Sequence, residues 1–512
     1  MKNILVFMTD HQPVMTMPPY LKAITPNIER VFKSGVSFTN AFCPSPHCCP
    51  SRATFFSGLY PSQHGVWNNV NVSNCLSRGM NEGTRIFAED LKEAGYNTYF
   101  SGKWHVSDEK RPSDYGFEEI FHKKQYGQHM NNPDNSEWRH YFSAKPESDG
   151  RYDKSKFDDY RRHARPTDTS GDIRGEAQCI RPGYPRYTQY GVKDNPYNDG
   201  AMTEATASFI RNGLPDDKPF FIFCSPTGPH DPYTPPREYL DMYKDFPVEL
   251  PPNFDDDLSD KPALYRRTKM AYSQLTREEH RESLRRFLAF CTYEDALFGK
   301  LVDALEDRNL LKDTVIMYLS DHGDYAGAHG LWAKGLPCFD EAYRICSLIA
   351  GTDIVNPGRI EDSLISMADY APTILELCGV KPRVPTAGRS LVPFLRGEKP
   401  KDWPDEVYSQ TNGNEVYGIQ RSYRNRRFKY VFNAFDFDEF YDLEKDPLQM
   451  HNIMGPDVMK DVRFAWKKIW KFAWEHDDAI VNPYIMTAFA PFGPGILFDG
   501  DEDAEKTSDC GK

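Results

Sequence analysis

Apolar residues along this chain gather in short continuous runs that are separated by amphipathic stretches. The first run, NILVFM at residues 3–8, is typical of a strand buried on both faces of a parallel sheet. Similar runs follow at residues 96–102, 219–226, 314–321 and 346–351. Helical periodicity fills the intervals, most clearly over residues 82–95 and 281–310. The pattern predicts an α/β fold with a large, mostly parallel central sheet sandwiched by helices.

The pattern changes near residue 395, where GRSLVPFLRGEKPKDWPDE predicts a linker. Strand-like segments follow it, and then an amphipathic helix that begins at Pro456. We therefore expect two domains with an insertion and a tail. They are a catalytic α/β domain (1–395) with a polar, aperiodic insertion (106–200), a smaller α+β domain built on a short antiparallel sheet (400–484), and the tail (485–512). An insertion this long without regular elements is either a loop that shapes substrate binding or a surface decoration without a role in binding.

Composition narrows the class of protein. The 512 residues carry a formal net charge of −13, which argues against a general binder of nucleic acid or anionic membranes. The N-terminal apolar run is shorter than the ~7–15 residues of a signal peptide core, and no run approaches the ~18 apolar residues of a membrane helix. The 11 cysteines are irregularly spaced, which favours reduced thiols over a disulfide scaffold. We expect a cytoplasmic protein without nucleic-acid or membrane partners.

Polar residues follow several predicted strands at the point where each strand ends. In open α/β sheets ligands bind at the carboxyl ends of the strands, so we expect these side chains to converge. An acid directly after a buried strand is costly to bury unless it is paired or bound to a cation. Asp10, Asp321 and His322 together therefore predict one divalent cation. A basic pocket suited to a tetrahedral oxyanion would come from Lys103, His105, His230, His329 and Lys334.

Three cysteines lie close together in CPSPHCCPSRATFFSG, residues 43–58. Cys43 and Cys48 are too far apart for the CxxC pair of a zinc knuckle, and a disulfide between the adjacent Cys48 and Cys49 would be strained. The proline that follows favours the first turn of a helix. Either Cys48 or Cys49 would then lie near a helix N-terminus, where backbone N–H groups stabilise an anion, with Arg52 one turn after Cys48. This arrangement suits a nucleophile for acyl, phosphoryl or sulfuryl transfer.

The segment Cys48-Cys49-Pro50-Ser51-Arg52 resembles the C-x-P-S-R signature of type I sulfatases, members of the alkaline phosphatase superfamily. Other segments resemble the family in the family's order: TPNIERVFKSGVSFTNAF, GLYPSQHGV, AGYNTYFSGKWH, SDHGDYAGAHGLWAKG, ADYAPTILELCGV, GRSLVPFLRG, FKYVFN and FYDLEKDP. The resemblance implies that Cys48 is oxidised to formylglycine, whose hydrated aldehyde is the nucleophile. A sulfated hydrate can expel sulfate by re-forming the carbonyl, whereas a thiol would form a stable adduct.

The resemblance also implies one divalent metal, which acts as a Lewis acid and activates the nucleophile. Its ligands would be Asp10, modified residue 48, Asp321 and His322. Many sulfatases carry Asp-Asp where this chain has Asp10-His11, and Asp-Asn where it has Asp321-His322. The second departure is shared with phosphonate monoester and phosphodiester hydrolases. The expected metal is therefore either calcium or manganese, with magnesium as a third option. His11 is a further candidate for metal or substrate binding.

The other implied roles concern charge and protons. Arg52 and Lys103 would stabilise the hydrate, and Lys334 would hold a sulfate oxygen. His230 would protonate the leaving alcohol, and His105 would take the proton as the hemiacetal collapses.

We favour a sulfate ester hydrolase because GKWH is the sulfatase form of its segment. A phosphonate monoester or phosphodiester hydrolase with the same machinery is the alternative, and a binding protein that keeps the fold without turnover is a third interpretation. The expected substrate is a small-molecule or carbohydrate sulfate ester, with Asn69 as a candidate contact. The other expected partner is a formylglycine-generating maturation enzyme, and self-association into a homo-oligomer is left open.

Overall fold

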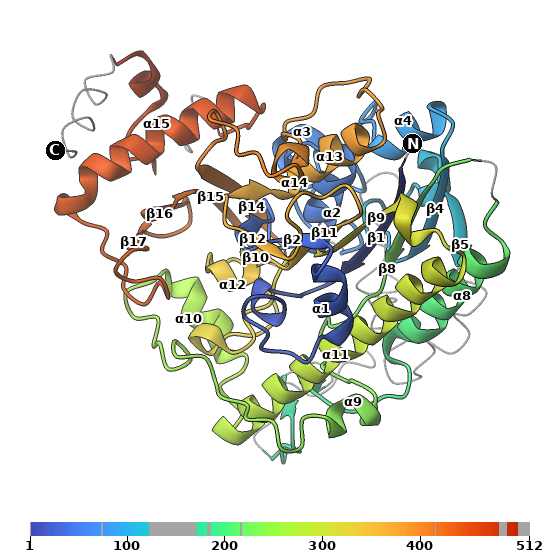
Figure 1. Ribbon diagram of the computed structural model, residues 1–512. Helices are drawn as coiled ribbons and strands as arrows, with labels where there is room; N and C mark the ends of the chain where they lie inside the picture. Colours follow the sequence, from blue (N-terminus) through green and yellow to red (C-terminus); the bar gives the residue numbers. More distant parts are fainter. Residues whose placement is uncertain are drawn as a thin grey trace, which may run out of the picture.

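The computed structural model describes residues 2–72, 75–121, 171–181, 186–215, 218–414, 416–480 and 489–499. Its centre is an eight-stranded sheet with the order β12-β2-β11-β9-β1-β8-β4-β5 (Figure 1). The strands are β1 (Asn3–Thr9), β2 (Gly35–Phe38), β4 (Asn97–Gly102), β5 (Glu118–Phe121), β8 (Phe220–Ser225), β9 (Thr314–Ser320), β11 (Ser347–Ala350) and β12 (Arg359–Glu361).

The sheet is mostly parallel, as the sequence predicts. Strand β1 pairs in parallel with β8 and β9, so that Ile4 lies between Phe221 and Val315. The pairs β4–β8, β4–β5 and β2–β12 are also parallel. Only β11 departs from this pattern within the sheet that the structure describes, running antiparallel to both β2 and β9. The apolar run at 346–351 thus contains a strand of the sheet, but this strand is antiparallel to both of its neighbours.

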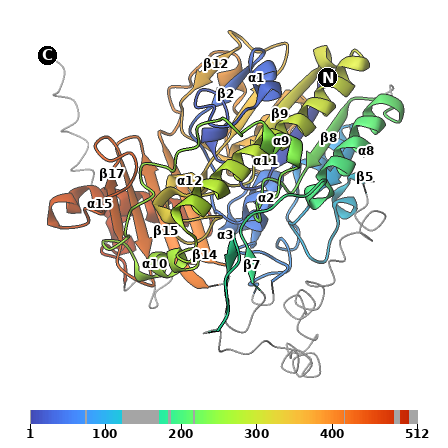
Figure 2. The same cartoon turned by 90° about the horizontal axis from the view of Figure 1, so that it is seen from below.

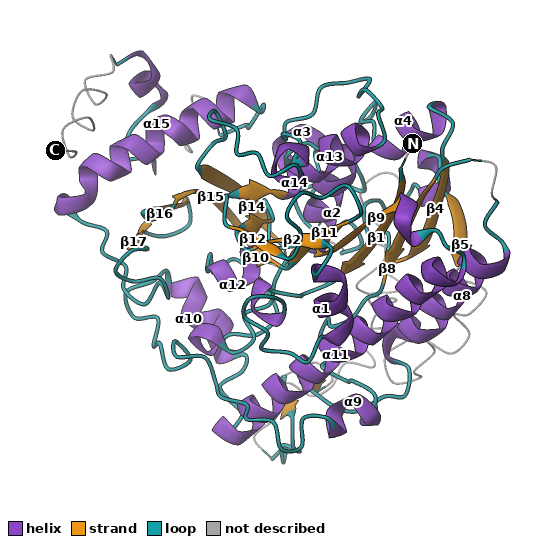
Figure 3. Cartoon of the chain, viewed as in Figure 1, coloured by secondary structure: helices purple, strands orange, loops and turns teal. Residues whose placement is uncertain are grey.

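Helices cover both faces of the sheet (Figures 1 and 3). The helices α2 (Cys48–Ser57), α4 (Phe87–Glu93) and α13 (Tyr370–Leu377) share one apolar cluster with Ile4, Val6 and Met8 of β1. The helices α8 (Asp199–Asn212) and α11 (Arg277–Asp307) share the opposite cluster with Leu5 and Phe7. Burial on both faces explains why β1 is continuously apolar, and it contributes about 1.5–3 kcal/mol for each large side chain.

A second, four-stranded sheet follows the predicted linker. It is antiparallel and consists of β14 (Glu406–Gly413), β15 (Tyr417–Asn425), β16 (Phe428–Asn433) and β17 (Glu439–Asp442). Helix α15 (Met459–Glu475) packs on it through Trp466, Ile469 and Trp470, the face that the periodicity predicts. This sheet and α15 lie on the side of the molecule away from β5 and α8 (Figure 2). The predicted α/β fold with a smaller α+β part is confirmed.

The remaining elements are short. Strands β3 (Ala41–Phe42), β10 (Arg344–Ile345) and β13 (Ile365–Ser366) form one small sheet, and β6 (Gln178–Cys179) pairs with β7 (Tyr187–Thr188). The short helices are α1 (Pro26–Phe32), α3 (Pro61–His64), α9 (Arg237–Asp241), α10 (Ala263–Met270), α12 (Asp340–Tyr343) and α14 (Val392–Leu395). Within the described ranges, none of the helices combines the length and the apolar character needed to cross a membrane. Much of the predicted insertion (106–200) and tail (485–512) lies outside the described residues.

Candidate active site

Four neighbouring strands of the central sheet deliver the candidate residues to one edge. In the order β9-β1-β8-β4, the chain leaves these strands at Asp321, Asp10, the loop with His230, and Lys103. The ammonium group of Lys103 forms an ion pair with the carboxylate of Asp10. Gly102 precedes this lysine with φ +99, and a Cβ there would lie 2.1 Å from the carbonyl oxygen of Ser225, so the close approach of β4 to β8 requires glycine. As predicted, the polar residues that follow these strands lie together at one edge of the sheet.

Cys48 is the first residue of α2 and is buried against these strand ends. Its Sγ lies 3.3 Å from Nε2 of His322 and 3.6 Å from Oδ1 of Asp10. Burial and Asp10 act to raise the pKa of the Cys48 thiol, but Lys103, Lys334 and His322 outweigh them and lower it to about 5. The other candidate of the sequence pattern, Cys49, differs: burial raises its pKa well above the ordinary value. Of the two cysteines, Cys48 is the one whose Sγ contacts Asp10 and His322, whereas Sγ of Cys49 accepts a hydrogen bond from the backbone N–H of Val70.

Four side chains bring possible metal donors together: Asp10, His11, Cys48 and His322, with their donor atoms within 4.8 Å of one another. Nδ1 of His322 lies 2.8 Å from the carbonyl oxygen of Gly323. Because a carbonyl only accepts, Nδ1 carries a proton, and Nε2, which faces Cys48 and Asp10, is the nitrogen available as a metal ligand. This donor set suits a divalent cation.

Asp321 lies beside this cluster with both carboxylate oxygens engaged. Oδ2 accepts a hydrogen bond of 2.7 Å from Nε of Arg52, and Oδ1 accepts one of 2.9 Å from the backbone N–H of His322. Oδ1 is also 3.7 Å from Nε2 of His322. The ligand set expected from the sequence therefore overlaps the donor cluster in Asp10, Cys48 and His322, and the cluster has His11 as its fourth member.

Arg52 is fully buried and joins three of the strand ends. Besides Asp321, its guanidinium donates hydrogen bonds of 2.8 Å to the backbone oxygen of Lys103 and to Oγ of Ser225. Nη2 has no hydrogen-bond partner among the described residues. Because a buried N–H without an acceptor is unfavourable, this nitrogen is suited to a ligand oxygen.

The facing wall of the site is made of His11, His230 and Lys334. The ammonium of Lys334 contacts Nε2 of His11 and lies 3.1 Å from Nε2 of His230. The two imidazole rings are 4.1 Å apart between centroids. Burial lowers the pKa of His230, and the charge of Lys334 lowers it further. His11 adopts φ +69, a left-handed conformation that is unusual for histidine and turns its ring into this cluster.

Comparison with known proteins identifies the family. The sulfatase family model matches residues 2–380. The chain belongs to the sulfatase family. A second model, that of the C-terminal region of N-sulphoglucosamine sulphohydrolase, matches residues 327–472.

Individual relatives support the same class of enzyme. This sulfatase is 28% identical to the choline-sulfatase of Rhizobium meliloti over 466 residues, which cover 88% of the chain and 82% of the relative. It is 26% identical to the N-acetylglucosamine-6-O-sulfatase of Bacteroides thetaiotaomicron over 477 residues, with the same coverage of 88% and 82%. Its fold is also that of the phosphonate monoester hydrolase of Agrobacterium radiobacter, with a TM-score of 0.72, 20% identity, and coverage of 93% and 96%. The chain is thus a sulfuric ester hydrolase of the alkaline phosphatase superfamily.

Two predicted site residues of the sulfatase have partners close to the site. Nε2 of His105 lies 2.9 Å from Oδ1 of Asn71, while Nδ1 of His105 is buried without a partner among the described residues. Oδ1 of Asn69 accepts a hydrogen bond of 3.2 Å from the backbone N–H of Cys49. Asn69 therefore supports the first turn of α2, next to the candidate nucleophile.

His329, expected in the basic pocket, has other partners. Its Nδ1 lies 2.7 Å from the carboxylate of Asp256, its Nε2 lies 3.0 Å from the side chain of Asn253, and its ring stacks on Phe339 at 3.6 Å. The prediction that His329 joins the strand-end residues is wrong. It lies in the same segment as Lys334, but both ring nitrogens are taken up by a buried structural cluster.

Sequence reasoning missed two acids that orient the histidines. Oδ2 of Asp324 lies 2.9 Å from Nδ1 of His11 and accepts a hydrogen bond of 2.8 Å from the hydroxyl of Tyr233. Burial raises the pKa of Asp324 to about 7. Asp231 similarly lies beside His230. Their position in the sequence could have indicated them, since Asp231 directly follows His230 and Asp324 lies two residues after His322.

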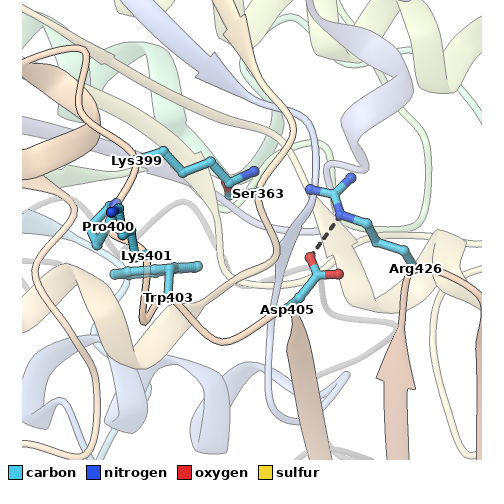
Figure 4. Close-up of a pocket in the computed structure, with 7 residues that line it drawn as sticks. All are labelled: Ser363, Lys399, Pro400, Lys401, Trp403, Asp405 and Arg426. Atoms are coloured by element: carbon cyan, nitrogen blue, oxygen red, sulfur yellow. Dashed lines mark hydrogen bonds and ion pairs between the residues drawn. The ribbon is translucent and has the colours of Figure 1, made fainter. Parts of the chain in front are cut away.

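A separate surface pocket lies beside the linker before β14 (Figure 4). It is lined by Ser363, Lys399, Pro400, Lys401, Trp403, Asp405 and Arg426. Asp405 and Arg426 form an ion pair of 2.7 Å across it. The lining contains none of the strand-end residues, so this pocket is distinct from the candidate active site of the sulfatase.

Proposed function

We propose that this sulfatase hydrolyses sulfate esters with formylglycine, formed from Cys48, as its nucleophile and with one bound divalent metal. The observation that carries the proposal is the position of Cys48. It begins α2, faces Asp10 and His322, and lies near the cationic groups of Lys103 and Lys334. Of the three cysteines in residues 43–58, it is the one with this environment. Oxidation by a maturation enzyme is part of the proposal.

The donor chemistry of the site fits a divalent metal. Asp10, residue 48 and His322 would hold it, with Asp321 as the fourth ligand and His11 as the alternative fourth ligand. The imidazole of His322 favours manganese, whereas carboxylate oxygens are equally suited to calcium and magnesium. When bound, such a metal supplies Lewis acidity and activates an oxygen nucleophile.

The hydrated aldehyde of formylglycine supplies a nucleophilic oxygen and can release sulfate by re-forming its carbonyl. The side chains around it would then manage charge and protons. Arg52 and Lys103 would stabilise negative charge on residue 48, and the ammonium of Lys334 would hold a sulfate oxygen. Nε2 of His230 would give a proton to the leaving oxygen, and His105 would accept the proton that residue 48 releases.

The substrate class that we propose is a sulfated sugar, with a small-molecule sulfate as the alternative. One relative is named as an N-acetylglucosamine-6-O-sulfatase, and another as a choline-sulfatase. We also propose that the protein works in a reducing compartment, the cytoplasm. The ten cysteines that the structure describes are all free, which agrees with that environment.

The test has two parts. Mass analysis of the tryptic peptide that contains Cys48, from protein co-expressed with a maturation enzyme, should show an aldehyde or its hydrate in place of the thiol. The same protein, loaded with Mn²⁺ or Ca²⁺, should hydrolyse 4-nitrophenyl sulfate and release sulfate from N-acetylglucosamine 6-sulfate. A fully active enzyme whose Cys48 is still a thiol would exclude the formylglycine mechanism.

Phosphonate monoester hydrolysis is the second candidate. His322 in the donor cluster favours it, because this histidine is the feature shared with phosphonate monoester hydrolases. Rates on phenyl phosphonate monoesters and on aryl sulfates, measured with one preparation, separate the two functions. A kcat/KM that is 100-fold higher on the phosphonate would replace the sulfatase proposal.

A further inference from the structure

The side chain of Asp231 connects a tyrosine to the histidine that faces the leaving group. The hydroxyl of Tyr187 donates a hydrogen bond of 2.7 Å to Oδ2 of Asp231. The other oxygen, Oδ1, lies 3.2 Å from Nδ1 of His230. The same Nδ1 lies 2.7 Å from the backbone oxygen of Asp231. The carboxylate of Asp231 thus connects Tyr187, through a hydrogen bond, to His230, through an ion-pair contact, while the hydrogen bond of Nδ1 goes to the backbone oxygen.

The contacts of Nδ1, led by its hydrogen bond to the backbone oxygen of Asp231, fix the tautomer of His230. Both oxygens near Nδ1 act as acceptors, so Nδ1 keeps its proton. The exchangeable nitrogen is then Nε2, which lies 3.1 Å from the ammonium of Lys334. The ring is therefore oriented with its reactive nitrogen toward the site and its other nitrogen toward an acid. An acid in this position also stabilises the imidazolium form.

Tyr187 is itself held in place by two backbone contacts between its segment and the loop of His230. The N–H of Tyr233 donates to the oxygen of Gln189 at 3.0 Å, and the N–H of Gly191 donates to the oxygen of Tyr233 at 3.1 Å. A bidentate ion pair of 2.6 and 2.8 Å between Arg174 and Glu279 anchors the preceding residues to α11. The described end of the polar insertion is therefore packed against the loop that carries His230.

We propose that Asp231 and Tyr187 are positioning residues for proton transfer by His230, an inference that rests on the proposed sulfate ester hydrolysis. As the bond between sulfur and the ester oxygen breaks, its electron pair stays on that oxygen. The Nε2–H bond of the His230 imidazolium breaks, and its proton forms the O–H bond of the departing alcohol. Sulfur forms its new bond to the nucleophilic oxygen of residue 48. Asp231 stays ionised and Tyr187 keeps its proton throughout.

Such a role predicts that the effect of a substitution on the rate depends on the pKa of the leaving group. A phenol of low pKa departs as an anion and gains little from an acid, whereas a sugar hydroxyl depends on one. Loss of the Tyr187 hydrogen bond should therefore slow poor leaving groups selectively. A merely structural role would slow every substrate by the same factor.

The experiment measures kcat/KM for a series of aryl sulfates with leaving phenols of graded pKa, and for a sugar sulfate. The variants are Tyr187→Phe and Asp231→Asn, with Tyr190→Phe as the matched control. Tyr190 is in the same segment, but its hydroxyl donates to Glu176 at 2.9 Å and not to Asp231. Thermal unfolding of each metal-loaded variant shows whether it is folded.

Tyr187→Phe should reduce the rate on the sugar sulfate by about 10-fold or more, because the lost hydrogen bond is to an ionised carboxylate. It should change the rate on 4-nitrophenyl sulfate by less than about 2-fold. Asp231→Asn should give a steeper dependence on phenol pKa and a loss of about 100-fold or more on the sugar sulfate. Tyr190→Phe should follow the wild type across the series.

Two negative results have different meanings. If the wild type hydrolyses the series but both Tyr187→Phe and Asp231→Asn keep its slope, the positioning role is overturned and the proposed function stands. If the wild type, carrying formylglycine and metal, hydrolyses no sulfate ester, the proposed function fails and this inference fails with it.

Discussion

The Sγ of Cys48 lies 3.3 Å from Nε2 of His322, although 274 positions separate the two residues in the chain. One begins helix α2 and the other follows strand β9, and the apolar packing of α2 on the sheet brings them together. A modified oxygen at position 48 would take the place of this sulfur. The contact is therefore consistent with the proposal that residue 48 serves both as nucleophile and as metal ligand.

Replacing either of the adjacent cysteines should have very different consequences. Cys48→Ala should abolish hydrolysis of aryl sulfates, because the variant cannot form an aldehyde. Cys49→Ala should keep most of the activity, since the thiol of Cys49 only accepts a backbone hydrogen bond of 3.3 Å from Val70 in the interior. The measurement is kcat/KM of both variants after co-expression with the maturation enzyme. Full activity of Cys48→Ala would reject the proposed nucleophile.

Metal removal should stop catalysis, and residue 322 should influence which ion restores it. Dialysis against a chelator should reduce the rate to background, and Mn²⁺ should restore it better than Ca²⁺. His322→Asn should reverse this order, because an amide oxygen replaces an imidazole nitrogen in the donor set. Activity titrations with each ion test the prediction. Unchanged preference in the variant would show that His322 does not bind the metal.

Arg52 should matter for stability as well as for catalysis. Arg52→Met leaves the buried carboxylate of Asp321 without its cation, which should cost about 3–5 kcal/mol in unfolding free energy. The activity should fall by about 100-fold or more, because a charged donor is lost. Urea unfolding of metal-free protein measures the first effect.

An exposed pair provides the control for this variant. Arg30 and Asp303 are 2.8 Å apart with both side chains near half exposed. Arg30→Met should therefore change the unfolding free energy by less than about 1 kcal/mol. Equal losses in the two variants would mean that the Arg52 pair is not stabilising through its burial.

Glu279 should make the fold sensitive to acid. Its hydrogen bonds with Arg174, together with backbone donors, lower its pKa from an ordinary value of 4.5 to about 2. A lowered pKa stabilises the folded state at pH values above the unfolded pKa, and this stabilisation is lost as the pH falls from about 4.5 toward 2. Glu279→Gln should therefore be less stable than wild type by about 1–3 kcal/mol at pH 7.

The difference between wild type and Glu279→Gln should shrink steadily when unfolding is measured at pH 4 and pH 3. Glu278→Gln is the control, because Glu278 is exposed and its ion pair is with the exposed Arg281. A constant difference from pH 7 to pH 3 would show that ionisation of Glu279 is not the cause.

Much of the fold follows from local pattern. Residues 4–8 and 315–319 are continuously apolar because both faces of the sheet are covered, and such strands are easily identified. The direction of β11 was not predictable in this way, since a continuous apolar run does not indicate whether a strand is parallel or antiparallel to its neighbours. The antiparallel pairing depends on the path of the chain through the loops between β9 and β11.

Site residues were predictable from the sequence where a polar side chain directly follows a predicted strand. Asp10 and Lys103 meet because the parallel strands β1 and β4, which lie on either side of β8, end at the same edge of the sheet. His329 shows the limit of such reasoning, because proximity in sequence to Lys334 did not decide where its ring points. Asp231 and Asp324 were missed because their role depends on which histidine nitrogen each one contacts, and the sequence does not show these contacts.

The sequence by itself determined the α/β fold, the family signature around Cys48 and the set of polar residues at the strand ends. These features are local, because periodicity, turn chemistry and a short motif are written in neighbouring residues. The tertiary structure decided that Cys48 and not Cys49 faces His322, that His11 joins the donor cluster, and that Tyr187 reaches His230 through Asp231. These outcomes depend on how helices and loops distant in the chain pack on the sheet, and this packing is settled by contacts between residues that are 44 to 274 positions apart in the pairs named here.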